Sequence, residues 1–418
     1  MFNKTIFHID FDSYFVSAHR SVDPSLIGKP VAIGRNLKRS IASSISYELK
    51  NKGAKTGWPN YKIFEIEPKT IIVEPNFELY VSISNKIFDY LSKKYSRFIE
   101  IYSIDECWID MTKLVVDTNP VKLAQKIQKE ILNKFKIPIT IGISYNKFLA
   151  KMATNLGKPF GIKFIDYFLM KDEIWPLDIE EFFGIGNNTI PKLRALNINK
   201  IGDLAKSDPY ELRLYDIFKS RTKILVDEAR GYGSDEIVIE HNHLKSIGTD
   251  LTFMSNDIDD YDHLLEILKS LTKKVCFKAS NRDLVGNVIY INIRDIDRKW
   301  TGKQHKMPIY SNEFSYIWSK IRELFDKTWK GNVLRGIGVK LMNVKPVSIV
   351  GTQLPLFTKN GEAIIEKAES EQEKTVKQLI KKINSTNMQE LVFTADKLEK
   401  KKHNNKIQTK FIDDDYVK

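Results

Sequence analysis

The chain has 418 residues, 42% of them hydrophobic, so it is long enough for several folded domains with cores of their own. Its formal net charge of +13 favours a polyanionic partner, nucleic acid before a membrane surface, although base bias in the gene would also enrich lysine. The chain has no run of about 18 apolar residues, no signal-peptide pattern and no closely spaced cysteines, which argues against a membrane span, a disulfide framework and a zinc site and predicts a cytoplasmic protein.

The first predicted element is a buried strand over residues 5–11, which carries Asp10 near its end and is followed by Asp12. The basic segment that follows, residues 11–75, contains several Gly and Pro residues at turn-like positions. We interpret it as a small subdomain inserted into a sheet domain.

The sheet domain resumes with an amphipathic helix over residues 76–95 and a hairpin of two short strands over residues 98–111. The tip of this hairpin presents Asp105 and Glu106. A helix over 120–134, a strand over 138–144 and a further helix that ends at Gly157 complete the pattern. Strands that alternate with helices predict an α+β domain in which Asp10, Asp105 and Glu106 meet at one edge of a sheet.

Neighbouring carboxylates repel one another and are tolerated together where divalent cations lie between them. Hard oxygen ligands with few His or Cys candidates nearby suit Mg²⁺ or Mn²⁺ rather than zinc. The acidic residues therefore favour a two-metal site for phosphoryl or nucleotidyl transfer. The alternative is that they are solvated acids of a hairpin turn.

From residue 166 the predicted elements change from alternating strands and helices to short helices. Short helices over 166–232 surround a Gly-rich hairpin with Gly184 and Gly186, whose backbone N–H groups are placed to bind a DNA phosphate; the alternative is an ordinary helical turn. Residues 233–243 are predicted to be a linker. Residues 244–350 follow the order βαββαβ if residues 305–309 form a strand before the second helix. The remaining tail is polar and is predicted to be partly disordered.

Four motifs in order resemble those of the Y-family, or translesion, DNA polymerases of the bacterial UmuC/DinB (ImpB/MucB/SamB) class. They are Asp10–Phe15, Ser103–Glu106, Lys147–Lys151 with Lys158–Gly161, and Lys245–Gly248. The likeness covers about residues 1–357, and the family-like order and spacing of all four motifs make it specific.

The resemblance implies an α+β multidomain fold shaped as a right hand. The palm, a mixed sheet plus helices, would comprise residues 1–10 and 76–165, the fingers 11–75, and the helical thumb with its helix-hairpin-helix 166–232. After the linker, a βαββαβ little finger would span 244–348 and a tail 349–418.

The resemblance also implies roles for residues of the palm and fingers. Asp10, Asp105 and Glu106, with the main-chain carbonyl of Phe11, would hold two Mg²⁺ ions, for which Mn²⁺ is a substitute. Phe15 matches the steric gate, an aromatic ring under the sugar that leaves no room for a 2′-hydroxyl. The triphosphate-binding residues would be Tyr14, Ser44, Tyr47, Lys50 and Lys158. Ser44, Tyr47 and Lys50 share a spacing of three, which predicts one helical face or a helix start. Lys50 stands where the family usually has Arg, so a point charge replaces a bidentate fork.

The implied activity is template-directed DNA synthesis of low fidelity, without proofreading, past damaged template bases. The partners would be primer-template DNA, deoxynucleoside triphosphates and the sliding clamp of the replicative polymerase, and the protein would be a monomer. The predicted clamp-binding residues lie within 353–357 and are Gln353, Leu354, Leu356 and Phe357. The tail beyond them favours the UmuC-like branch of the family.

Two other classes compete with this interpretation. A nucleotide cyclase also uses a palm-like sheet with metals, but it has no need of a DNA-binding hairpin, a basic C-terminal domain or a clamp peptide. A non-catalytic DNA-binding or clamp-binding scaffold has no reason to combine Asp10, Asp105 and Glu106 with Phe15.

Overall fold

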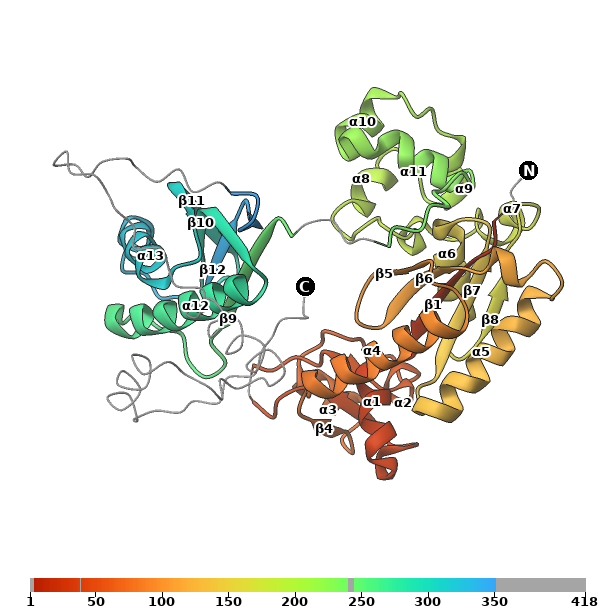
Figure 1. Ribbon diagram of the computed structural model, residues 1–418, viewed down its shortest axis with the longest axis horizontal. Helices are drawn as coiled ribbons and strands as arrows, with labels where there is room; N and C mark the ends of the chain where they lie inside the picture. The colour runs from red at the N-terminus through yellow and green to blue at the C-terminus, as the bar shows by residue number, and fades with distance from the viewer. Residues whose placement is uncertain (1–3, 38, 240–243, 351–418) are drawn as a thin grey trace, which may run out of the picture. The chain divides into compact units, whose positions relative to one another are not determined.

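The computed structural model describes residues 4–350 except residue 38 and residues 240–243, and it divides the chain into two units, Met1–His241 and Asn242–Lys418 (Figure 1). The boundary between the units falls inside the predicted linker. None of the helices in the described ranges is both long and apolar enough to cross a membrane.

The first unit is built on a five-stranded sheet with the order β5-β6-β1-β7-β8. These strands are β1 (Ile6–Phe11), β5 (Ile99–Ile101), β6 (Glu106–Asp110), β7 (Ile139–Ser144) and β8 (Ile162–Phe164). All neighbours are antiparallel except β7 and β8. The predicted central strand and the predicted hairpin are both confirmed.

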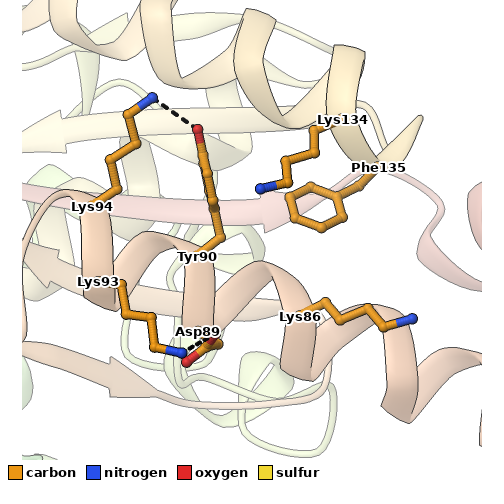
Figure 2. Close-up of a pocket in the computed structure, with 7 residues that line it drawn as sticks. All are labelled: Lys86, Asp89, Tyr90, Lys93, Lys94, Lys134 and Phe135. Carbon is orange, nitrogen blue, oxygen red and sulfur yellow. Dashed lines mark hydrogen bonds and ion pairs between the residues drawn. The ribbon is translucent and has the colours of Figure 1, made fainter.

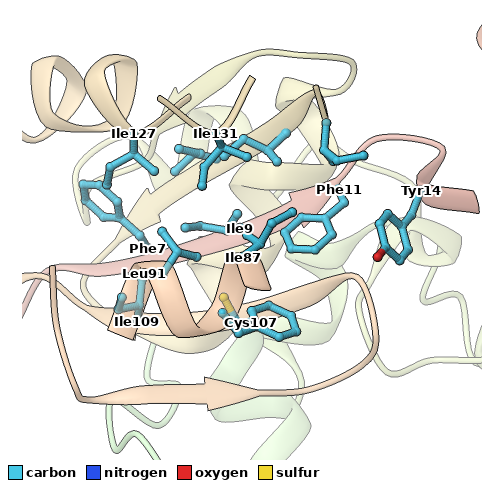
Figure 3. Close-up of a cluster of buried hydrophobic side chains, with 14 of the residues drawn as sticks. Phe7, Ile9, Phe11, Tyr14, Ile87, Leu91, Cys107, Ile109, Ile127 and Ile131 are labelled. Atoms are coloured by element: carbon cyan, nitrogen blue, oxygen red, sulfur yellow. The ribbon is translucent and has the colours of Figure 1, made fainter. Parts of the chain in front are cut away.

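Helices cover both faces of this sheet, which explains why every residue of β1 is buried. On one face, α4 (Phe77–Lys94) and α5 (Pro120–Phe135) pack on Phe7, Ile9 and Phe11 through the side chains shown in Figure 3. Because side chains alternate along a strand, His8 and Asp10 point to the opposite face. That face is covered by α6 (Lys147–Gly157), which the Asn146 side chain caps as predicted.

The segment between β1 and α4 forms a three-stranded sheet with the order β3-β2-β4. Its elements are α1 (Tyr14–Val22), η1 (Pro24–Leu26), β2 (Val31–Ile33), β3 (Ser44–Ile45), α2 (Tyr47–Lys50), α3 (Asn60–Ile66) and β4 (Ile71–Val73). This sheet has a small core of its own around Ile45, Leu49 and Ile63. The buried side of α1, however, joins the core of the large sheet.

Short helices follow the large sheet and share one core. They are α7 (Met170–Glu173), η3 (Ile179–Glu181), α8 (Ile190–Arg194), α9 (Ile201–Lys206), α10 (Leu212–Phe218), η4 (Lys219–Arg221) and α11 (Thr222–Ala229); η2 (Thr112–Leu114) lies earlier, after β6. The element directly before Gly184 is the 3-10 turn η3, so the predicted helix-hairpin-helix begins with a 3-10 turn in place of an α-helix. Gly184 adopts φ of +97°, a conformation that favours glycine.

The second unit has the predicted βαββαβ order. Its elements are β9 (Ser246–Thr252), α12 (Tyr261–Asn281), β10 (Leu284–Arg294), β11 (Trp300–Ser311), α13 (Phe314–Thr328), β12 (Gly336–Met342) and a short β13 (Lys345–Pro346) that pairs with β10. Helices α12 and α13 cover the face of the sheet that carries Ile289, Ile291 and Val339. The alternate residues, among them Tyr290 and Lys340, belong to the other face.

Candidate active site

Two of the predicted metal ligands face each other on neighbouring strands. Asp10 of β1 and Glu106 of β6 are direct partners in the antiparallel register. The hairpin between β5 and β6 places Asp105 beside them, because the Phe11 backbone N–H donates a hydrogen bond of 2.8 Å to the Asp105 carbonyl. The sheet therefore brings the three acidic residues to one edge, as the sequence predicts.

Two lysines neutralise these carboxylates. Lys151 of α6 has its Nζ 3.3 Å from Asp10 Oδ2 and also donates to Glu106, so one ammonium group is shared by two carboxylates. Lys158 has its Nζ 2.6 Å from Asp10 Oδ1. Asp105 is instead bonded by the Ser103 hydroxyl at 2.6 Å.

The donor set fits a hard divalent cation, because the ligands are carboxylate oxygens and the shared ammonium shows that Asp10 and Glu106 can hold one cation between them. Within the described ranges, no three Asp, Glu, His or Cys side chains are grouped as a ready-made metal site.

The two hairpin acids have opposite electrostatic environments. Burial raises the pKa of Asp105 to about 6, and the nearby charges of Asp10 and Glu106 act in the same direction, although the Ser103 hydrogen bond opposes them. Burial alone would also raise the pKa of Glu106, but the neighbouring His8 ring and the charge of Lys151 lower it to about 2. Glu106 is thus kept ionised, while the ionised form of Asp105 is held at a cost in stability.

Asp12 is a structural acceptor in this structure. Its carboxylate accepts hydrogen bonds from the Thr140 hydroxyl at 2.9 Å, the Phe160 N–H at 2.9 Å and the Tyr47 hydroxyl at 3.2 Å. These contacts use both of its oxygens. They also tie α2 to the large sheet.

Three of the predicted triphosphate-binding residues lie beside the carboxylates. Lys50 Nζ stands 4.3 Å from the ring centre of Tyr47, Tyr47 reaches Asp12, and Lys158 reaches Asp10. Burial lowers the pKa of Lys50, and the nearby charge of Lys158 adds to this effect. The helical-face interpretation of the Ser44 spacing is wrong, because Ser44 lies in β3 and the helix begins only at Tyr47.

The predicted gate residue is held by aromatic packing. The half-buried Phe15 ring is stacked on Tyr80, with centroids 4.2 Å apart and planes 7° apart. The Tyr80 hydroxyl is hydrogen-bonded to His19 Nε2 at 2.9 Å, which fixes this supporting ring. Tyr14 is 2% exposed and donates to the Tyr80 carbonyl, so only its backbone is available to a triphosphate.

Sequence reasoning missed two residues of this site. Lys151 was assigned no role, although it lies one helical turn after Lys147 on a helix that had to pack against the sheet. His8 was also assigned no role, but its Nε2 lies 3.4 Å from Glu106 Oε2 and its Nδ1 2.9 Å from Thr154 Oγ1. Its position two residues before Asp10 on one strand was the available signal, because residues i and i+2 share a face.

The remaining predicted site residues lie elsewhere. A Cβ atom at Gly186 would meet nothing within 4 Å, so this hairpin glycine is open to a ligand, whereas one at Gly184 would lie 3.4 Å from Arg221. The clamp-binding residues Gln353, Leu354, Leu356 and Phe357 lie outside the described residues.

A basic groove lies between α4 and α5, on the face of the sheet opposite to the carboxylates (Figure 2). It is lined by Lys86, Asp89, Tyr90, Lys93, Lys94, Lys134 and Phe135. Lys93 is paired with Asp89 at 2.8 Å, and Lys94 donates to the Tyr90 hydroxyl at 2.9 Å. We assign this groove no part in the reaction, because the sheet separates it from the carboxylates.

Comparisons with known proteins agree with this geometry. Residues 9–155 match the impB/mucB/samB family, and residues 244–356 match the impB/mucB/samB family C-terminal domain. The chain is 33% identical to DNA polymerase IV of Oceanobacillus iheyensis over 415 residues, which cover 99% of this chain and 97% of that protein. It is 34% identical to DNA polymerase IV of Ureaplasma parvum over 357 residues, which cover 85% of this chain and 98% of that protein.

Solved structures point the same way. The Y-family DNA polymerase chimera Dbh-Dpo4(243-245)-Dbh has a TM-score of 0.72 at 29% identity, covering 82% of this chain and 99% of that chain. The insertion ternary complex of Dbh DNA polymerase has a TM-score of 0.56 at 29% identity with the same coverage. Because the first relative aligns over almost the whole chain, the polar tail no longer favours the UmuC-like branch.

Proposed function

The chain belongs to the impB/mucB/samB family of Y-family, or translesion, DNA polymerases and is a DNA-directed DNA polymerase, and from this premise we propose that it copies damaged templates by two-metal nucleotidyl transfer. The observation that carries the proposal is the register pairing of Asp10 with Glu106 beside Asp105, with Lys158 and Tyr47 next to them. This edge combines ligands for cations with groups suited to a triphosphate.

In the proposed reaction, Asp10, Asp105 and Glu106 would hold two divalent ions, and the Phe11 carbonyl would be a further ligand. The ions, when bound, lower the pKa of the primer 3′-hydroxyl and neutralise the charge that develops on the leaving pyrophosphate. His8 and Lys151 hold Glu106 from its protein side.

The residues proposed to bind the nucleotide lie in the segment that forms the small sheet and directly after α6. Lys158, Lys50 and the Tyr47 hydroxyl would bind the triphosphate, with Ser44 and the backbone near Tyr14 as further contacts. Lys158 would then exchange its contact with Asp10 for one with a phosphate oxygen. Phe15, supported by Tyr80, would exclude a ribose 2′-hydroxyl.

Primer-template DNA would be bound at three places. They are the end of the large sheet that carries Asp10, Asp105 and Glu106, the hairpin of Gly184 and Gly186, which is open to a ligand at Gly186, and the face of the second sheet that carries Tyr290 and Lys340. The small sheet of the proposed fingers has strands of only two or three residues, so it offers few contacts that could test a nascent base pair. We therefore propose low fidelity, and by analogy with the family we propose that the enzyme lacks proofreading and is monomeric and cytoplasmic.

Primer extension on an abasic-site template tests the proposed function, with an intact template and the Asp105→Ala protein as controls. The wild type is expected to extend primers past the abasic site, and Asp105→Ala is expected to extend on neither template. A wild type that copies the intact template but stops before the abasic site would refute lesion bypass.

Deletion of residues 353–357 is expected to leave clamp-independent extension within about twofold and to abolish stimulation by the sliding clamp. The physical reason is that Leu356 and Phe357 are the proposed apolar anchors of a groove-binding peptide. Extension rates with and without the clamp loaded on DNA measure both effects. Undiminished clamp stimulation of the deletion variant would contradict the assignment, and a scrambled 353–357 segment of the same composition is the matched control.

A further inference from the structure

Lys151 is a buried lysine beside the proposed metal ligands Asp10 and Glu106. Its side chain is 10% exposed, and its ammonium group contacts Asp10 Oδ2 at 3.3 Å and Glu106 Oε2. These carboxylates belong to two different strands, β1 and β6, and Lys151 reaches both from α6. A single cation of the protein therefore bridges two of the proposed metal ligands.

The charge of Lys151 has two opposite effects on cation binding by these carboxylates. Two buried carboxylates repel each other, and Lys151 relieves that repulsion and draws the side chains together. A positive charge at this place also lowers the negative potential that would attract another cation. Lys151 thus stabilises the pair of ligands and competes with any divalent ion for their charge.

Helix α6 carries a second partly buried lysine, Lys147, whose carboxylate partner is not a proposed metal ligand. Lys147 lies one turn before Lys151, and its Nζ is 2.9 Å from Glu100 Oε2, with side chains that are 18% and 16% exposed. Glu100 also accepts a hydrogen bond from the Val238 N–H, so this pair holds residue 238, within the predicted linker, against the sheet. Lys147 is therefore the matched example of a purely structural ion pair.

We propose that Lys151 is a positioning residue that sets, and limits, the affinity of Asp10 and Glu106 for divalent cations. The inference rests on the proposed two-metal function and deepens it. Lys151 acts through the two carboxylates and has no assigned contact with DNA or nucleotide. Its effect is consequently visible in cation binding by the protein without substrates.

The test is Mn²⁺ binding to the full-length protein without DNA or nucleotide, measured by the electron paramagnetic resonance signal of free Mn²⁺. Lys151→Met is expected to bind Mn²⁺ on the order of tenfold more tightly than the wild type, because a like charge is removed a few ångströms away. Lys151→Arg keeps the charge and is expected to stay within about threefold of the wild type. Lys147→Met is expected to leave the Mn²⁺ affinity unchanged.

Thermal unfolding supplies an independent readout. In EDTA the Tm of Lys151→Met should fall, and saturating Mn²⁺ should restore most of the difference from the wild type, because tighter binding to the folded state stabilises it more. The decrease in Tm that Lys147→Met causes relative to the wild type should be the same in EDTA and in Mn²⁺. Lys151→Gln, whose amide still donates hydrogen bonds, replaces Lys151→Met in both measurements if the latter does not fold.

The outcomes separate the inference from the function on which it rests. Unchanged or weaker Mn²⁺ binding by a folded, neutral Lys151 variant overturns the inference alone. Wild-type Mn²⁺ binding that is insensitive to Asp10→Asn overturns the proposed centre, and the inference with it. Tighter binding by Lys151→Met that disappears in the Lys151→Met, Asp10→Asn double variant supports both.

Discussion

Replacement of Asp105 by alanine is expected to lower kcat for nucleotide addition on an undamaged template on the order of 10³-fold, or about 4 kcal/mol in transition-state stabilisation. Asp105 is the acid of the centre whose burial raises its pKa, to about 6, so the protein holds an ionised carboxylate there against its own stability. Such a cost is typical of a group kept for function. The Tm of Asp105→Ala without substrates is accordingly expected to be no lower than that of the wild type.

Single-turnover incorporation of one nucleotide measures the effect. Asp110→Ala is the matched control, because Asp110 lies at the far end of β6, pairs with Ile6 in the register and accepts a hydrogen bond from the Thr112 N–H. It should retain activity within a few-fold. Extension by Asp105→Ala at the wild-type rate would show that Asp105 is a solvated turn residue and holds no ion.

Replacement of Phe15 by alanine is expected to reduce the preference for deoxynucleotides over ribonucleotides on the order of 10²-fold. The reason is steric, since the ring is stacked on Tyr80 and cannot yield to a 2′-hydroxyl. The ratio of kcat/KM for the two sugars with the same base is the measurement. The loss should come mainly from improved ribonucleotide insertion.

Tyr80→Phe separates the gate from its hydrogen-bonded support. It keeps the stacked ring and removes the hydroxyl bonded to His19, so it should cost about 1 kcal/mol of unfolding free energy and leave sugar selection unchanged. If Phe15 is only a core residue, Phe15→Ala will lower stability by about 3–5 kcal/mol, and the sugar preference will stay as it was.

The parts of the fold that sequence analysis predicted well have strong local signals. The apolar run of β1, the Pro at the start of α5 and the Asn146 cap of α6 each mark an element without reference to its neighbours. The βαββαβ order of the second unit followed from alternating apolar positions. Strand β11 was predicted too short, because its exposed residues show no apolar alternation over most of their length.

For the site, the information in the sequence came only from residue types and from the family resemblance. The acids of β1 and of the hairpin were predicted to meet, and their register places them opposite each other. The partners that tune them were not predictable in the same way: His8, Lys151 and Thr140 come from three elements, and their contacts depend on how α6 and β7 pack on β1. A single helical face for Ser44, Tyr47 and Lys50 was wrong because Ser44 lies in β3, two residues before the cap of α2, whereas the alternative of a helix start describes the segment better.

The central claim is that Asp10, Asp105 and Glu106 hold the ions at which nucleotides are joined. Anomalous X-ray scattering from Mn²⁺, in crystals of the protein with primer-template DNA and an incoming deoxynucleotide, tests it most directly. The account predicts anomalous peaks among the carboxylate oxygens of these three residues, next to the primer end and the triphosphate. A bound primer end and triphosphate with the Mn²⁺ peaks away from all three carboxylates would contradict it.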